Sequence, residues 1–260
     1  MSEPKSLPLA RIFWLLDYDG SLCPHREAWE VGHYEPKVLR QILDALSSRS
    51  RGLMWNTGRS VESLATQAED FLKHPGFFEH GTCFWDGQKK MDLVKTVLNP
   101  AIVEGVKAWA DERREWIRLE FKTHSLRVIP MQEQDRSRLR AEFTSSKIFR
   151  AIAADPSIYA SEGWRAFEIL LTGANKAAAV DYLVSNVGAF KGALPVAVGD
   201  DMADSGVVRA VLSLGGHAFL VGNHCGWVAD IPHKASQVSF FTSPQELLAH
   251  LSHVADKGEI

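Results

Sequence analysis

The sequence lacks the features that define several large classes of protein. Three of its 260 residues are cysteine, and Cys23, Cys83 and Cys225 form no Cys-x-x-Cys pair, so neither a disulfide framework nor a zinc knuckle is expected. Scattered thiols suit a reducing compartment, and we expect a cytoplasmic protein. Lysine plus arginine (29) nearly balances aspartate plus glutamate (32), which provides no basic surface for nucleic acid or an anionic membrane.

Long hydrophobic runs are also missing. The first apolar run, 12–16, is too short for a signal peptide. The stretch 210–229 lacks Asp, Glu, Lys and Arg, but its four glycines and two histidines make it poor material for a membrane span. The absence of a Gly-x-Gly-x-x-Gly motif after the first predicted strand disfavours a dinucleotide-binding oxidoreductase. We therefore expect a soluble monomer that acts on a small molecule, with neither nucleic acid nor membrane as a partner.

The sequence does contain short apolar runs that alternate with amphipathic helices. Residues 35–49 carry leucine and isoleucine at helical spacing, and further helices are expected after 61, from Lys176 and from Pro244. This alternation predicts an α/β core, with a parallel sheet covered by helices on both faces. The predicted strands are 11–16, 52–55, 194–198, 218–221 and 238–241.

The middle of the chain follows a different pattern. Helix, strand and strand occur twice there, which predicts a small α+β module inserted into the parallel core. We place this module, a cap domain, at 97–171 and the core at 1–96 and 172–260. Its expected helices are 99–114 and 132–147, and its expected strands are 119–123, 126–129, 149–153, 158–160 and 166–171.

Acidic residues follow two of the predicted core strands. Asp17 and Asp19 come after the first strand, and Asp200, Asp201 and Asp204 come after strand 194–198. Ligands of open α/β sheets bind outside the carboxyl ends of the strands. Carboxylates packed together repel one another unless a cation neutralises them, and Mg²⁺ is commonly held by a few carboxylates together with substrate phosphate. The five aspartates therefore predict a Mg²⁺ site that receives a phosphoryl group.

Four side chains suit the steps of phosphoryl transfer. Asp17 can attack phosphorus to form an aspartyl-phosphate, which divides a slow hydrolysis into two easier steps. Asp19 can protonate the leaving oxygen and later deprotonate the attacking water. The Thr57 hydroxyl and the Lys176 ammonium can bind the equatorial phosphoryl oxygens, where negative charge builds up in the transition state.

Several of these candidates also have structural interpretations. Gly58 and Arg59 complete the substrate-binding loop after Thr57, but for Arg59 a structural ion pair at a helix start is the favoured interpretation. Thr57 itself is a possible helix cap, and Lys176 a possible solvated surface residue. Acids such as Asp201 stabilise helix N-termini, so Asp201 is the metal candidate expected to be partly structural.

In chain order, Asp17-Tyr-Asp-Gly-Ser, Thr57, Lys176 and Gly199-Asp-Asp-Met-Ala-Asp204 resemble the four motifs of the haloacid dehalogenase-like phosphatases. An insertion between the second and third motifs resembles the type-2 (C2B) cap of that superfamily. Within it the sequence looks most like the trehalose-6-phosphate phosphatases, a likeness that extends to Glu79-His80-Gly81 and Leu220-Val-Gly-Asn223. The resemblance implies Mg²⁺-dependent hydrolysis of trehalose-6-phosphate to trehalose and phosphate, a step of trehalose biosynthesis.

The resemblance also implies a sugar site on the cap. Glu120, Lys122 and Ser125 fit the Glu-x-Lys-x-x-Ser pattern of that family, and Glu168 matches a second cap glutamate. These residues would hydrogen-bond the hydroxyls of the sugar distal to the phosphate, and Trp164 is a candidate to flank it. Glu120 and Lys122 also suit a plain ion pair, because residues i and i+2 share one face of a strand.

Departures from the family pattern leave other substrates open. Ile129 and Met131 stand where the family has a histidine and an arginine, and Ala203 and Ser205 replace residues of its last motif. A sucrose, mannosylglycerate or monosaccharide phosphate is the alternative substrate, and a non-catalytic sugar-phosphate sensor is the alternative function. A phosphorylated receiver domain gathers similar residues, but it is about half this length and lacks an insertion between its hydroxyl and lysine.

Overall fold

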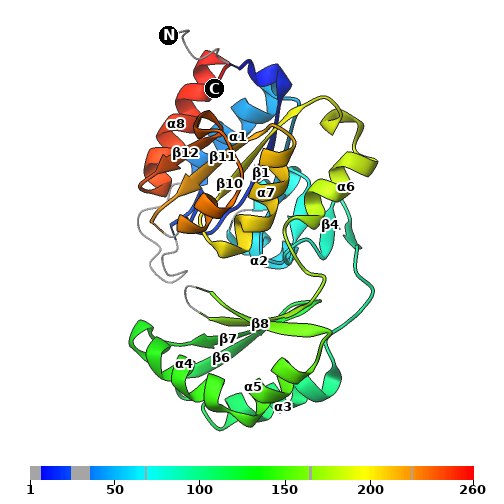
Figure 1. Cartoon of the computed structure of the whole chain (residues 1–260), viewed down its shortest axis with the longest axis vertical. Helices are drawn as coiled ribbons and strands as arrows, with labels where there is room; N and C mark the ends of the chain where they lie inside the picture. Colours follow the sequence, from blue (N-terminus) through cyan, green and yellow to red (C-terminus); the bar gives the residue numbers. More distant parts are fainter. Residues whose placement is uncertain (1–6, 25–35, 68, 164–165, 224) are drawn as a thin grey trace. The chain divides into compact units, whose positions relative to one another are not determined.

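The chain leaves one structural unit near residue 91 and returns to it near residue 175 (Figure 1). The structure, a computed structural model, describes residues 7–24, 36–67, 69–163, 166–223 and 225–260. Residues 1–91 and 175–260 form the first unit, the core, and residues 92–174 form the second, the cap. The cap range expected from the sequence, 97–171, lies inside the second unit.

An eight-stranded sheet organises the core, in the order β12-β11-β10-β1-β2-β3-β4-β5. The six strands from β12 to β3 are parallel, and β4 pairs antiparallel with β3. The α/β class predicted from the sequence is therefore confirmed. The strands are β1 (Ile12–Leu16), β2 (Gly52–Asn56), β3 (Gly76–Phe78), β4 (Cys83–Trp85), β5 (Lys90–Asp92), β10 (Leu194–Gly199), β11 (His217–Val221) and β12 (Val238–Phe241).

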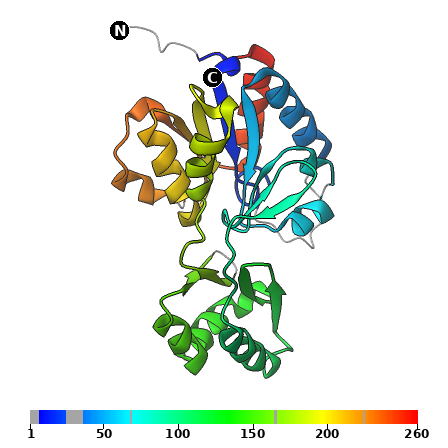
Figure 2. The same ribbon diagram turned by 90° about the vertical axis from the view of Figure 1, so that its right-hand side faces the viewer.

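Helices cover both faces of this sheet, because successive side chains of each buried strand point to opposite faces. Trp14 and Leu16 of β1 pack in one cluster with α1, α2 and α8, whereas Phe13 and Leu15 pack in another with α6 and α7 (Figure 2). The α-helices are α1 (Pro36–Arg49), α2 (Val61–Gln67), α6 (Ala178–Asn186), α7 (Ser205–Ser213) and α8 (Pro244–Lys257). Short 3₁₀ helices are η1 (Leu9–Arg11), η2 (Glu69–Lys73), η4 (Gly188–Phe190), η5 (Met202–Asp204), η6 (Gly226–Asp230) and η7 (Ala235–Gln237).

The cap is a four-stranded antiparallel sheet, in the order β6-β7-β9-β8, with helices on one face. Its strands are β6 (Ile117–Phe121), β7 (Ser125–Pro130), β8 (Ile158–Glu162) and β9 (Phe167–Leu171). Its helices are α3 (Pro100–Asp111), η3 (Glu133–Asp135), α4 (Arg136–Ser145) and α5 (Lys147–Ala154). Leu126, Val128 and Ile169 of the sheet pack on Val106 and Phe143 of the helices.

One expected cap strand is wrong, because residues 149–153 lie in helix α5. Ser146 is extended, with ψ 157°, which ends α4, and its hydroxyl accepts a hydrogen bond from the N–H of Phe149 at 3.0 Å. Ser146 is therefore the N-cap of a second helix. A short apolar run such as 148–153 has no periodicity long enough to distinguish a strand from a buried helix turn.

Within the described part of the chain, no helix has the length and apolar character needed to cross a membrane. None of the three cysteines forms a disulfide bond.

Candidate active site

Three strands of the core end side by side, and each is followed by a predicted site residue. β1 lies between β10 and β2, and all three are parallel. Asp17 follows β1, Thr57 follows the last residue of β2, and Asp200 follows β10. The carboxyl ends of parallel strands meet at one edge of a sheet, so these residues converge at the edge where ligands of such sheets bind.

A lysine and three aspartates form the centre of this site. Lys176 donates to Asp17 Oδ1 at 2.6 Å and to Asp204 Oδ1 at 2.7 Å. Asp17, Asp200 and Asp204 each offer a carboxylate oxygen, and these oxygens lie within 4.8 Å of one another. All four residues are buried. The alternative of Lys176 as a solvated surface lysine is thereby wrong.

Burial and mutual repulsion shift the pKa values of these groups. Burial raises the pKa of Asp17 well above its ordinary value against the opposing charge of Lys176, and Asp204 and Asp200 raise it further. Burial also raises the pKa of Asp204, to about 6. Burial alone would lower the pKa of Lys176, but the two carboxylates outweigh it and hold that pKa well above its ordinary range. The ammonium is therefore charged throughout the range in which proteins work.

The donor set fits a divalent cation. Three buried carboxylates beside one ammonium have an excess of two negative charges when ionised. Buried charges need a partner, and a doubly charged ion with a preference for carboxylate oxygen would neutralise this excess. Asp17, Asp200 and Asp204 are therefore the residues of the described chain best placed to hold Mg²⁺.

The other two predicted ligands make different contacts. The Asp201 side chain accepts from the N–H of Ala203 at 2.8 Å and caps η5, while Asp204 Oδ2 accepts from the N–H of Asp201 at 3.4 Å. This arrangement agrees with the partly structural role expected for Asp201. Asp19 forms a bidentate ion pair with Arg59, with both contacts at 2.7 Å. Arg59 thus makes the ion pair expected of it.

The loop after β2 places Thr57 in the site. Thr57 is buried, and its hydroxyl accepts from the N–H of Arg59 at 3.2 Å, which holds the loop in a tight turn. Gly58 lies against the ring of His80, and a Cβ added at Gly58 would meet that ring at 2.6 Å. A larger residue at position 58 would therefore require the His80 ring to move.

Three further polar side chains, absent from the predicted site, hold its residues in place. The buried Ser21 hydroxyl lies 3.3 Å from Asp17 Oδ2 and 3.2 Å from Asp200 Oδ1, and can donate to either. The Cys225 thiol donates to the backbone carbonyl of Asp200 at 3.2 Å, and Asn56 Nδ2 donates to that of Lys176 at 3.1 Å. A sequence signal existed for Ser21, because a hydroxyl four residues after Asp17 in a tight turn can reach back to it.

The cap residues predicted for the sugar lie in one network. Glu168 accepts from Lys122 at 2.5 Å and from the Ser125 hydroxyl at 2.9 Å. Strand register places Glu120, Arg127 and Glu168 in one row across β6, β7 and β9, and Arg127 donates to Glu120 at 3.1 Å. Arg127 Nε also lies 3.9 Å from Glu168 Oε2, so Arg127, which was not among the predicted residues, links the two glutamates.

Two residues that depart from the family pattern, Ile129 and Met131, lie in the cap. Ile129 is buried, whereas the Met131 side chain is 43% exposed. Trp164 lies outside the described residues. The side chains of Ile129 and Met131 are apolar, so neither provides the polar contacts of the histidine and arginine that the family has at those positions.

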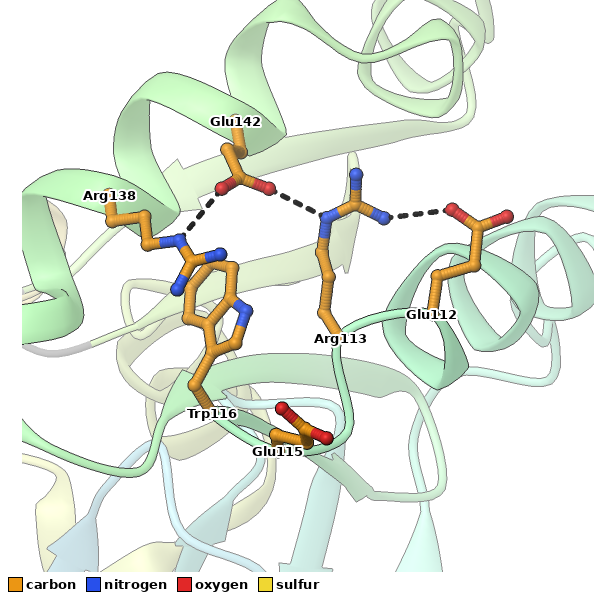
Figure 3. Close-up of a pocket in the computed structure, with 6 residues that line it drawn as sticks. All are labelled: Glu112, Arg113, Glu115, Trp116, Arg138 and Glu142. Carbon is orange, nitrogen blue, oxygen red and sulfur yellow. Dashed lines mark hydrogen bonds and ion pairs between the residues drawn. The ribbon is translucent and has the colours of Figure 1, made fainter.

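A separate pocket in the cap is lined by Trp116 and five charged residues, of which Glu112, Arg113, Arg138 and Glu142 are joined by ion pairs (Figure 3). Glu142 accepts from Arg113 and from Arg138, both at 2.8 Å, and the Arg138 guanidinium lies 4.1 Å from the centre of the Trp116 ring. Arg113 and Arg138 thus have carboxylate partners, which is the pattern of a surface ion-pair network. The pocket is about 300 Å³ and is lined by Glu112, Arg113, Glu115, Trp116, Arg138 and Glu142.

Comparisons with known proteins identify the fold. No family model and no curated protein matches the chain. A haloacid dehalogenase-like hydrolase from Bacteroides thetaiotaomicron is 14% identical, with a TM-score of 0.61 over 94% of this chain and 99% of its own. The chain has the haloacid dehalogenase-like fold. The resemblance stated from the four motifs is thereby confirmed at the level of the fold.

Two other solved structures with this fold belong to proteins whose names state a function. The C-terminal domain of trehalose-6-phosphate phosphatase from C. albicans is 18% identical, with a TM-score of 0.76 over 95% of this chain and 92% of its own. The C-terminal domain of the trehalose synthase regulatory protein from Candida albicans is 14% identical, with a TM-score of 0.65 over 93% of each chain. One fold therefore occurs in a protein named as an enzyme and in one named as a regulator.

Proposed function

We propose that the protein is a Mg²⁺-dependent phosphatase that hydrolyses a sugar phosphate, with trehalose-6-phosphate as the first substrate to test. The observation that carries this proposal is the buried group of Asp17, Asp200, Asp204 and Lys176 at the carboxyl edge of the sheet. It combines a nucleophile, a cation for phosphoryl oxygens and a donor set for a divalent ion. Bound Mg²⁺ would neutralise the carboxylates and draw charge from the phosphoryl oxygens.

Asp17 is the proposed nucleophile. Attack by a carboxylate oxygen on phosphorus forms the aspartyl-phosphate, and the bond from phosphorus to the sugar oxygen breaks. Lys176 already donates to Asp17, so its ammonium lies beside the phosphoryl group that Asp17 would carry. The Thr57 hydroxyl would donate to a second phosphoryl oxygen. Water then attacks the aspartyl-phosphate and releases inorganic phosphate.

Asp19 is the proposed acid and base. It would give a proton to the departing sugar oxygen and take one from the attacking water, which keeps the proton count balanced over the cycle. Both of its oxygens are engaged by Arg59 in the structure. At least one of these carboxylate oxygens must leave Arg59 before Asp19 can reach the substrate. Substrate binding would therefore loosen the ion pair between Asp19 and Arg59.

The cap network is proposed to recognise the sugar. Sugar hydroxyls both donate and accept hydrogen bonds, and paired acidic and basic side chains can offer both kinds of partner. Glu168 is bonded to Lys122 and Ser125, and Glu120 is bonded to Arg127, so the network holds two acceptor groups beside two cations. A neutral polyol is the chemistry that such a balanced network suits.

The test is phosphate release from a panel of phosphosugars in the presence of Mg²⁺. The panel contains trehalose-6-phosphate, sucrose phosphate, mannosylglycerate phosphate and monosaccharide phosphates. The Asp17→Asn variant is the control. We expect turnover in the wild type and none in the variant. Preference for trehalose-6-phosphate would support that substrate, and preference for another phosphosugar would support the same chemistry on a different sugar.

A non-catalytic sugar-phosphate sensor is the second candidate. It is favoured by the Candida albicans regulatory protein, whose C-terminal domain has the same fold. Tight binding of a phosphosugar without any phosphate release would support the sensor and contradict the phosphatase. Both Asp17 and Asp19 are present, so the residues proposed for turnover are available in this chain.

A further inference from the structure

Three consecutive residues after β3 adopt a left-handed backbone. The φ angles of Glu79, His80 and Gly81 are 51°, 57° and 84°. Among the described residues, every other positive φ belongs to a glycine. A side chain in this conformation brings its Cβ close to the backbone and costs free energy, so such residues persist only where their surroundings hold them. We call residues 79–81 the left-handed turn.

The turn is bonded to the loop that carries Thr57. The N–H of His80 donates to the carbonyl of Thr57 at 3.2 Å, and the N–H of Glu79 donates to the carbonyl of Arg59 at 2.9 Å. The Glu79 side chain is buried and pairs with Lys90 at 3.2 Å. The turn is thus fixed at one side by an ion pair and at the other by two backbone hydrogen bonds to the Thr57 loop.

The turn also contacts the two segments that carry Thr57 and Lys176, which are proposed to bind the phosphoryl group. The His80 ring lies 2.6 Å from the position that a Cβ at Gly58 would take. A Cβ at Gly81 would stand 2.6 Å from the carbonyl of Asn175, the residue before Lys176. One strained turn therefore packs against the residue that follows Thr57 and the residue that precedes Lys176.

We propose that the left-handed turn sets the separation of Thr57 and Lys176, and that His80 is a positioning residue that acts through Gly58. The inference rests on the proposed function, because its effect is on phosphoryl transfer. In the folded core His80 keeps a conformation that glycine would adopt at lower cost. If the strain at His80 serves to hold Thr57 and Lys176 in place, releasing it should lower turnover. The stability of the protein should then stay level or rise.

The first experiment replaces His80 with glycine, which relieves the backbone strain and removes the ring. The kcat for the preferred phosphosugar and the Tm are measured together. We expect kcat to fall at least tenfold while the Tm stays level or rises. A KM that changes less than threefold would place the effect in the reacting geometry and not in sugar binding.

The second experiment tests the contact between the ring and Gly58. Gly58→Ala would displace the ring that we propose to act on Gly58, so we expect a loss of kcat of more than tenfold in the wild-type background. The same substitution added to His80→Gly should cost less than threefold, because the ring is absent. The matched control is Gly188→Ala, where an added Cβ meets no atom within 4 Å and kcat should be unchanged.

The outcomes separate this inference from the function on which it rests. A wild type that hydrolyses no phosphosugar overturns the proposed function and the inference with it. An active wild type with equally active His80→Gly overturns the inference alone. A fall in both Tm and kcat of His80→Gly makes the turn a plain structural element, which also overturns it. If Gly58→Ala does not fold, the His80→Gly measurements decide.

Discussion

The charge excess at the active site predicts how stability depends on pH when divalent ions are removed. The pKa of Asp204 is about 6 in the folded protein and 3.8 ordinarily, because burial disfavours its ionised form. A pKa raised by folding means that the folded state binds the proton more tightly. The resulting stabilisation is complete below pH 3.8 and is lost as the pH rises through 6. Asp17 is shifted in the same direction.

The shift of Asp204 sets the size of the effect. A rise of about two pKa units corresponds to roughly 3 kcal/mol between the two limits, at 1.36 kcal/mol per unit. Most of this change lies below pH 5, so between pH 5 and pH 7 the contribution of Asp204 is about 1 kcal/mol. Asp17 would add to the loss. Mg²⁺ bound to the folded state at 100 times its Kd would restore about 2.7 kcal/mol.

The assay is guanidinium unfolding of metal-stripped protein at pH 5 and pH 7. Histidines whose pKa burial lowers, such as His74 and His250, contribute with the opposite sign, so each measurement is compared with Asp204→Asn. The free energy of unfolding of the wild type should fall by about 1 kcal/mol more than that of the variant. The exposed Asp230→Asn should behave as the wild type does. Equal pH slopes in the wild type and Asp204→Asn would refute the reasoning.

Three further substitutions test other parts of the site. Ser21→Ala should weaken Mg²⁺ binding roughly tenfold by calorimetry, because the hydroxyl orients two of the proposed ligands, and an unchanged Kd would contradict this role. Lys176→Met should lower the metal-free free energy of unfolding by roughly 3–5 kcal/mol, since it leaves buried carboxylates unpaired, and denaturation with and without Mg²⁺ would show part of that loss restored. Glu168→Gln should raise the KM for the phosphosugar roughly tenfold and leave turnover of a small phosphomonoester unchanged, since it loses a charge-assisted bond. Equal effects on both substrates would exclude a sugar contact.

Five of the eight core strands, β1, β2, β10, β11 and β12, were predicted from the sequence because their signals are local, whereas β3, β4 and β5 were not predicted. The strands β1, β2 and β10 are short apolar runs, each followed by a polar residue, as Asp17 follows Leu16, and parallel pairing then brings the strand ends together. Lys176 was predicted as the cation of the site because it lies near the start of the helix before β10, and its ammonium does contact Asp17. These features need no knowledge of side-chain packing, so the order of the motifs was enough to predict that these side chains lie close together.

The parts that could not be predicted depend on contacts between distant segments. Asp200 and Cys225 are 25 residues apart, and a thiol bonded to a backbone carbonyl has no sequence pattern. The register that sets Arg127 beside Glu120 follows from the β6–β7 hairpin, which the sequence fixes only approximately. The left-handed φ of Glu79 and His80 is likewise imposed by their neighbours, because residues with a Cβ adopt that conformation only uncommonly.

The charge excess also separates the two candidate functions. A phosphosugar brings a phosphate dianion, and a sensor that binds it without a cation would place that dianion beside three carboxylates that, when ionised, exceed the ammonium by two charges. Repulsion in a buried site is strong, so binding should require a divalent ion. With the ion bound, the phosphoryl group would lie beside Asp17, where attack can follow. Calorimetry of the Asp17→Asn variant with the preferred phosphosugar should therefore show binding with Mg²⁺ and at least tenfold weaker binding in chelator. Equal affinity under both conditions would place the phosphate away from the carboxylates and favour a sensor.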